Sequence, residues 1–116
     1  MKIIHLNDAE KKEVNMEGAS LAYKQVPISA RDGSPNSSWR VFTLKPGGYT
    51  PYHQHHFEHL NFVISGNGVV VDGNKEKKEI KAGDFVLMLP DQKHQYRNAS
   101  DTEDFVMICG VPKEYE

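Results

Sequence analysis

Short apolar runs broken by turn-forming residues fill most of this sequence. From Leu21 onwards, runs rich in Val, Ile, Phe and Tyr alternate with clusters of Gly, Pro, Asn and Asp. β-Branched and aromatic residues favour strands, whereas the intervening clusters favour turns. Strands are expected at residues 21–29, 39–45, 50–56, 59–65, 68–72, 76–81, 84–89, 94–98 and 103–110. This succession predicts an all-β sandwich or small barrel rather than a parallel α/β fold.

The residues between these runs predict where the chain reverses. Turns are expected at residues 46–48, 65–68 and 72–74, and a loop at residues 30–38. Pro27 marks the end of the first strand or an edge position, because proline donates no sheet hydrogen bond. Residues 1–20 are polar and alternate weakly. Within them, Asn7 or Asp8 is expected to cap a short helical turn over residues 9–14.

The size and charge of the chain argue against several classes of function. Its 116 residues have room for one domain, which is expected to span residues 1–116. A net charge of −2, without a long basic run, argues against nucleic-acid binding. The longest apolar run, residues 85–89, is too short to cross a membrane. Because the N-terminal residues turn polar before a signal-peptide core could form, a cytoplasmic protein is expected.

Histidine is the one residue type whose distribution is unusual. Four of the six histidines, His53, His55, His56 and His59, lie within seven residues. In a strand, residues two apart share a face, so His53 and His55 point the same way and His56 points oppositely. A hairpin would then return His59 beside them. His94 opens a later strand, and closing a small barrel could bring this fourth imidazole to the same point.

Neutral imidazoles are ligands that transition metals prefer. Four of them would leave up to two open positions on an octahedral ion, where water or a substrate could bind. We therefore predict a metal site formed by His53, His55, His59 and His94. His5 and His56 are expected to lie outside it. The single cysteine, Cys109, excludes both an intramolecular disulfide and a thiolate cluster.

Two segments resemble the conserved motifs of the cupins. Residues 46–68, PGGYTPYHQHHFEHLNFVISGNG, resemble the first motif, with its leading Gly, its H-x-H pair, a following acidic residue and a closing Gly. Residues 83–98, GDFVLMLPDQKHQYRN, resemble the second motif, with Gly-Asp, Pro, His and an Asn four residues later. The short stretch between the motifs is typical of small bacterial single-domain cupins. One departure is Asp91, which follows Pro90 where a Gly is common.

The resemblance implies a double-stranded β-helix, or jelly-roll, barrel with a metal near its mouth. It implies His53 and His55 as ligands from the first motif and His94 from the second. The usual fourth ligand of cupins is a glutamate, at the place that His59 occupies here, so the chain looks like the four-histidine variant of small manganese-binding cupins. In the alternative, a β-bulge turns Glu58 inward as the fourth ligand. Mn or Fe is expected first, with Zn, Ni, Cu or Co as alternatives.

Strand periodicity suggests further residues for the pocket. Arg40 and Phe42 share a face, and Arg40 either meets a substrate carboxylate or lies on the surface. On the last strand, Phe105, Met107 and Cys109 share one face, and Val106 and Ile108 lie on the other. Either set could line the barrel or pack its core. The candidate pocket residues besides the histidines are Arg40, Phe42, Tyr52, Glu58, Tyr96, Phe105 and Met107.

Two classes of function fit this site. The first is a metal-dependent, dioxygenase-like oxidoreductase that acts on a small organic molecule bound at open metal positions. The second is a non-catalytic module that binds or senses a small ligand. A homodimer is expected in either case, because a small open barrel leaves sheet edges and residues 1–30 supply apolar strand that one barrel need not consume. Neither nucleic acid nor a membrane is expected as a partner.

Overall fold

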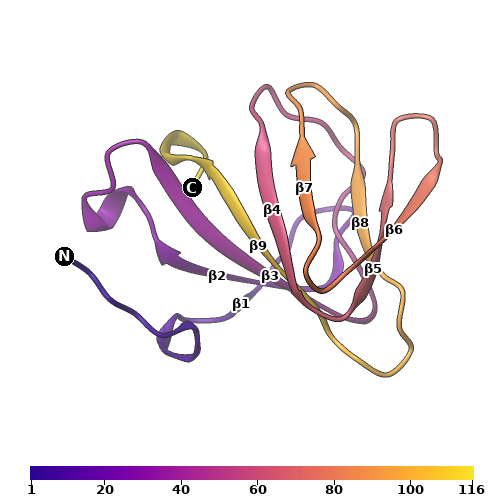
Figure 1. Ribbon diagram of the computed structural model, residues 1–116, viewed down its shortest axis with the longest axis horizontal. Helices are drawn as coiled ribbons and strands as arrows, with labels where there is room; N and C mark the ends of the chain where they lie inside the picture. Colours follow the sequence, from indigo (N-terminus) through magenta and orange to yellow (C-terminus); the bar gives the residue numbers. More distant parts are fainter.

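The computed structural model describes residues 1–116 as a curled, antiparallel β-sheet with three short 3-10 turns (Figure 1). The all-β prediction is confirmed. No helical segment is long and apolar enough to cross a membrane. In chain order the elements are η1 (Leu6–Asp8), β1 (Lys12–Glu13), β2 (Ser20–Ile28), η2 (Ala30–Asp32), β3 (Ser37–Tyr49), β4 (His59–Ser65), β5 (Asn67–Val71), β6 (Lys77–Lys81), β7 (Phe85–Met88), β8 (Gln95–Asn98), β9 (Phe105–Pro112) and η3 (Lys113–Tyr115).

The strand order along the sheet is β6-β5-β8-β3-β9-β4-β7, with β2 beside β3 and β1 beside β2. Strands that are neighbours in the sheet are therefore mostly distant in the sequence. β6, β5 and β8 form one wing, whereas β2, β9, β4 and β7 form the other, and β3 belongs to both (Figure 1). Because the wings curl toward each other, the inward faces of both strand sets enclose one interior.

β3 passes between the wings without a turn, so the turn predicted at residues 46–48 is wrong. Up to Leu44 the strand pairs with β9, and at Tyr49 it pairs with β8. Gly47 supports the irregularity between these partners with a φ of +82°, which is a left-handed conformation. A Cβ on Gly48 would lie 2.7 Å from the carbonyl oxygen of Leu21. The glycines therefore let one strand change partners instead of ending it.

The strand predicted at residues 50–56 is also wrong. The segment that joins β3 to β4 is irregular, apart from a single antiparallel bridge between His53 and His94. Pro51 has no amide hydrogen to donate, which disfavours a regular ladder here. The hairpin expected between residues 50–56 and β4 does not form, because β4 pairs with β7 and β9.

The helical turn predicted at residues 9–14 is wrong as well. The turn lies earlier, at Leu6–Asp8, and its cap is the His5 imidazole, which accepts a hydrogen bond from the Asn7 amide. Residues 12 and 13 instead pair with β2. The strand predicted at residues 39–45 extends four residues further, to Tyr49, and the remaining predicted strands begin and end within two residues of those observed.

The hydrophobic core lies between the two wings. Buried residues alternate with more accessible ones along the strands, and β9 alternates buried and half-buried residues over its whole length. Phe105, Leu44 and Val63 are completely buried. The core cluster is Ala22, Leu44, Val63, Val70, Met88, Tyr96, Phe105 and Met107. Both wings contribute to it, so the core fixes the positions of the strands that surround the histidines.

Candidate metal centre

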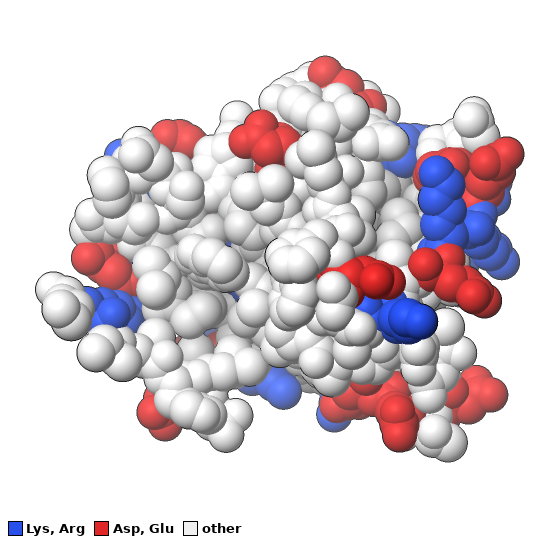
Figure 2. Space-filling model, viewed as in Figure 1, with Lys and Arg blue, Asp and Glu red and all other residues white.

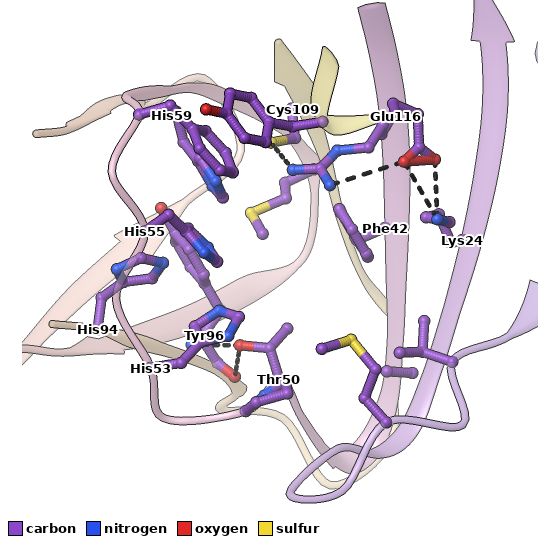
Figure 3. Close-up of a pocket in the computed structure, with 18 residues that line it drawn as sticks. Lys24, Phe42, Thr50, His53, His55, His59, His94, Tyr96, Cys109 and Glu116 are labelled. Atoms are coloured by element: carbon purple, nitrogen blue, oxygen red, sulfur yellow. Dashed lines mark hydrogen bonds and ion pairs between the residues drawn. The ribbon is translucent and has the colours of Figure 1, made fainter. Parts of the chain in front are cut away.

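Four imidazoles converge on one side of a pocket between the wings (Figure 3). His53 and His55 come from the irregular segment before β4, His59 is the first residue of β4, and His94 immediately precedes β8. His53 and His55 have ring centroids 4.1 Å apart, His55 and His59 4.5 Å, and His59 and His94 5.5 Å. One ligand atom each from His53, His55 and His94 lies within 4.8 Å of the others, so these three could hold a metal ion.

Strand alternation and one bridge position these rings. Along β4, His59 lies on the same inward face as the buried Asn61 and Val63. His94 points inward with Tyr96 for the same reason. The backbones of His53 and His94 exchange two hydrogen bonds, which ties the irregular segment to β8. The convergence therefore depends on both cupin-like motifs at once.

Burial keeps the four imidazoles neutral at pH 7. Desolvation lowers the pKa of His55 to about 4 and that of His59 to about 3. The positive charge of Arg40 is the second cause of the low pKa of His59. Burial also lowers the pKa of His53 and of His94. Neutral imidazole is the form that binds a metal.

The donor atoms fit a divalent transition metal. Nε2 of His55 and Nε2 of His59 are buried and have no hydrogen-bond partner, an arrangement that is rare in folded proteins. Nδ1 of His94 lies 2.7 Å from the carbonyl oxygen of Gln92, so it donates there in the neutral ring and leaves Nε2 as the free ligand atom. An all-nitrogen set of this kind suits Zn, Cu, Fe or Ni and also accepts Mn or Co.

The pocket that these histidines face has a volume of about 320 Å³. Its walls are mostly apolar, and Phe42, Phe57 and Met107 are among the residues that line it. Three charged side chains, Lys24, Arg40 and Glu116, also reach it. Figure 3 shows the histidines on one side of the pocket and Phe42, Lys24 and Glu116 on the other.

The structure brings four of the other predicted pocket residues to this cavity. Arg40, Phe42, Tyr96 and Met107 all line it. The Tyr96 hydroxyl donates a 2.6 Å hydrogen bond to Oδ1 of Asn61, and burial raises its pKa above the usual value. This hydroxyl is therefore a protonated, already partnered group.

Three predicted pocket residues lie elsewhere. Glu58 is exposed and lines a separate groove on the outside of the sheet, because it lies one residue before the inward position of His59. Phe105 is completely buried in the core. Tyr52 lies outside the cavity, with its hydroxyl donating to the carbonyl oxygen of Asp72 and its ring covered by the ammonium groups of Lys75 and Lys93.

His5 and His56 do not join the cluster. His5 caps η1, and the exposed His56 contacts the carboxylate of Asp91. Asp91 has a φ of +65°, the left-handed conformation that a glycine commonly supplies at this place in the cupin motif. Aspartate thus preserves the loop despite the departure in sequence.

Several lining residues were not singled out from the sequence. Lys24 shares an inward face of β2 with Ala22, so alternation along residues 21–29 could have suggested it. Tyr115 and Glu116 follow the last strand and carry no motif. Phe57 stacks on Tyr115 with ring centroids 3.6 Å apart, which closes the pocket near His55.

Comparisons with known proteins agree with this architecture. The family model described as "Cupin domain" matches residues 40–111. Gentisate 1,2 dioxygenase 1 from Aquipseudomonas alcaligenes is 36% identical over 58 residues. That match spans 50% of this chain and only 17% of the relative, which is a much longer protein.

Solved structures resemble the chain over almost its whole length. The polyketide cyclase RemF from Streptomyces resistomycificus superposes with a TM-score of 0.91 at 23% identity, over 97% of this chain and 79% of that one. A predicted oxalate decarboxylase from Thermotoga maritima superposes with a TM-score of 0.83 at 20% identity, over 97% of this chain and 99% of that one. A cupin-2 domain from Rhodospirillum rubrum superposes with a TM-score of 0.81 at 19% identity, over 96% of this chain and 74% of that one. These likenesses confirm the predicted jelly-roll barrel, and at such identities they show the fold alone.

Proposed function

The chain belongs to the cupin domain family, and from that premise we propose that it is a metal-dependent, dioxygenase-like oxidoreductase acting on a small organic molecule. The observation that carries the proposal is the pair of buried, unpartnered Nε2 atoms of His55 and His59, which lie beside His53 and His94 in a mostly apolar cavity. His53, His55 and His94 would hold the ion, with His59 as the fourth ligand and Mn or Fe as the metal.

The chemistry of the remaining pocket residues supports a metal as the reactive group. When bound, such a metal supplies Lewis-acid and redox chemistry at its open positions. The Tyr96 hydroxyl donates to Asn61, so it is not free to act as a base. Cys109 is only 1% exposed, so its thiol is poorly accessible as a nucleophile. Phe42, Phe57 and Met107 exclude water from the substrate position. The other side chains of the pocket would therefore bind and orient the substrate.

The partial identity with a gentisate 1,2 dioxygenase favours a dioxygenase reaction over other cupin reactions. Fold alone would not do so, because one fold hosts many activities. The alternative function is binding of a small ligand without turnover, which the same apolar cavity and neutral histidines would serve.

Elemental analysis of tag-free protein tests the proposal. The metal is stripped, and the protein is reconstituted separately with Mn²⁺ and with Fe²⁺. We expect stoichiometric binding by the wild type. His59→Ala should bind the metal at least about tenfold more weakly, because loss of a metal ligand lowers the affinity by at least this factor. Glu58→Ala is the matched control, and its affinity should equal that of the wild type.

Oxygen consumption is then measured across a panel of small organic acids, phenols and diketones. Substrate-dependent consumption by the reconstituted wild type, lost in His94→Ala, supports the oxidoreductase. Absence of metal binding after reconstitution contradicts the metal centre. Metal binding without turnover of any panel member would favour the ligand-binding module.

A further inference from the structure

Arg40 is a largely buried cation whose partners are few and weak. Its side chain is 12% exposed, and its Nε is buried without a hydrogen-bond acceptor. A guanidinium carries five N–H donors and stays charged at any physiological pH. The one hydrogen bond it makes goes from Nη2 to Sγ of Cys109, at 3.1 Å, and sulfur is a weak acceptor. Its planar group also lies 5.1 Å from the ring centroid of Phe42.

The nearest carboxylate is already engaged by another cation. Glu116 places Oε1 2.8 Å and Oε2 3.3 Å from Nζ of Lys24. Its distance to Nη1 of Arg40 is 4.0 Å, at the limit of an ion pair. Lys24 and Arg40 are the basic residues lining the cavity, and Glu116 is the acidic one. The charged side chains that line the cavity therefore carry one surplus positive charge, and Arg40 is the more deeply buried of the two cations.

This charge acts on the histidines as well. Arg40 lines the same cavity as His53, His55 and His59, so its positive charge faces the space in front of the imidazoles. Burying a charge with only weak partners is costly, and a metal ion would add further positive charge. An anion in the cavity would offset the charge of Arg40 and that of a metal ion.

We propose that Arg40 is the specificity-determining residue of this pocket and that it binds the carboxylate of a small, largely apolar organic acid. The volume of about 320 Å³ is at the lower end of the roughly 300–1,000 Å³ typical of small-molecule sites. Phe42 and Met107 offer apolar contact beside the guanidinium. This assignment rests on the proposed function, in that it takes the pocket occupant to be the substrate.

Benzoate and benzamide separate charge from shape, because they are nearly isosteric and only benzoate is anionic. Their affinities are measured by calorimetry on metal-free protein in chelator, so that binding to a metal cannot supply the preference. Wild type should prefer benzoate by at least about tenfold, the size of a charge-assisted hydrogen bond. Arg40→Gln should reduce this preference to less than about threefold, because benzoate loses much more affinity than benzamide.

Glu116→Gln is the reciprocal variant. Removing the one acidic side chain of the pocket should strengthen benzoate binding by about threefold or more, without changing benzamide affinity. A gain of affinity cannot come from misfolding. Equal affinities in wild type, absence of binding, or a preference that survives in Arg40→Gln would overturn the proposal. Because metal is absent throughout, failure of the metal centre leaves this result intact and is detected separately by elemental analysis.

Discussion

His53 and His94 are joined by two backbone hydrogen bonds, from the amide of each to the carbonyl oxygen of the other, of 3.0 and 2.9 Å. This bridge is the only β-pairing in the segment between β3 and β4. It places one candidate metal-binding histidine from each cupin motif side by side. The geometry of the candidate metal centre therefore depends on a short and locally weak piece of backbone.

Metal binding should rigidify this segment. The amides of residues 54–58 donate no hydrogen bond, so hydrogen exchange there is expected to be fast in the metal-free protein. Reconstitution should slow exchange in residues 54–58 by at least about tenfold, because bound His55 restrains the chain. Mass-spectrometric exchange measures the effect, and β3 and β9 serve as internal references. In His94→Ala the added metal should give no protection, and protection there would contradict the prediction.

The strands and the inward residues could be predicted because they follow local rules. Residues 59–65 were expected as a strand with His59, Asn61 and Val63 on one face, and the structure has all three buried on β4. The alternation of side chains between the two faces of a strand, together with the positions of Gly and Asn in turns, is sufficient to predict such strands. The same rule brought Arg40 and Phe42 to a common face.

Positions that depend on long-range pairing could not be predicted in this way. Pro46 to Gly48 have the composition of a turn, but β3 continues because β8 and β9 offer it partners on both sides of the irregularity. Likewise, Phe105 was a pocket candidate on the face of Met107. Its place in the core follows from the packing of Gly68 against its ring, which no local pattern encodes. The ends of the chain, including Glu116, carry no periodic signal.

The stability of the metal-free protein should fall in mild acid. Burial lowers the pKa of His55 to about 4 and of His59 to about 3, whereas both take their ordinary value, near 6.5, when unfolded. Between these values the unfolded chain binds more protons, so the free energy of unfolding is highest above pH 6.5 and decreases as the pH falls. We expect a loss on the order of 3 kcal/mol between pH 6.5 and 4.5, allowing for solvent at half-buried His55.

Urea unfolding at a series of pH values, in chelator, measures this dependence. His59→Asn removes the imidazole with the lowest pKa. Below pH 6, the number of protons taken up on unfolding, which sets the slope of the free energy of unfolding against pH, should therefore decrease by about one. An unchanged slope in His59→Asn would show that this ring is already solvated in the native state.

Replacing Gly68 should be destabilising although the residue lies at the start of a strand. A Cβ there would lie 2.5 Å from Cε2 of Phe105, whose ring is completely buried. Gly68→Ala should therefore lower the free energy of unfolding by about 1–3 kcal/mol through overpacking. Gly73→Ala is the control, because its Cβ would have ordinary contacts of 3.7 Å and the stability should stay equal or rise slightly. Combining Gly68→Ala with Phe105→Leu should recover part of the loss, and additive effects would contradict the assigned contact.

Two copies of the chain are expected to associate through the outer face of the wing that β2, β9, β4 and β7 form. Phe85 is 82% exposed, Leu60 is 60% exposed and Trp39 is 48% exposed, and these three line one outer groove. Figure 2 shows this side over β4 and β7 as mostly uncharged, whereas Lys, Arg, Asp and Glu gather toward β6. Monomers seldom leave contiguous apolar surface of this kind in water, and a self-complementary face favours a two-fold dimer.

Light scattering after size exclusion at micromolar concentration tests the dimer. Phe85→Glu places a charge in the apolar groove and should convert the wild-type dimer into a monomer, since an unpaired charge cannot be buried at the interface. Lys77→Gln lowers the net charge by the same amount on the opposite wing, where the side chain is exposed on β6, and should remain dimeric. Metal content should be equal in both variants, because Phe85 and Lys77 lie outside the cavity that holds the histidines. A wild-type monomer, or a Phe85→Glu dimer, would exclude this face as the interface.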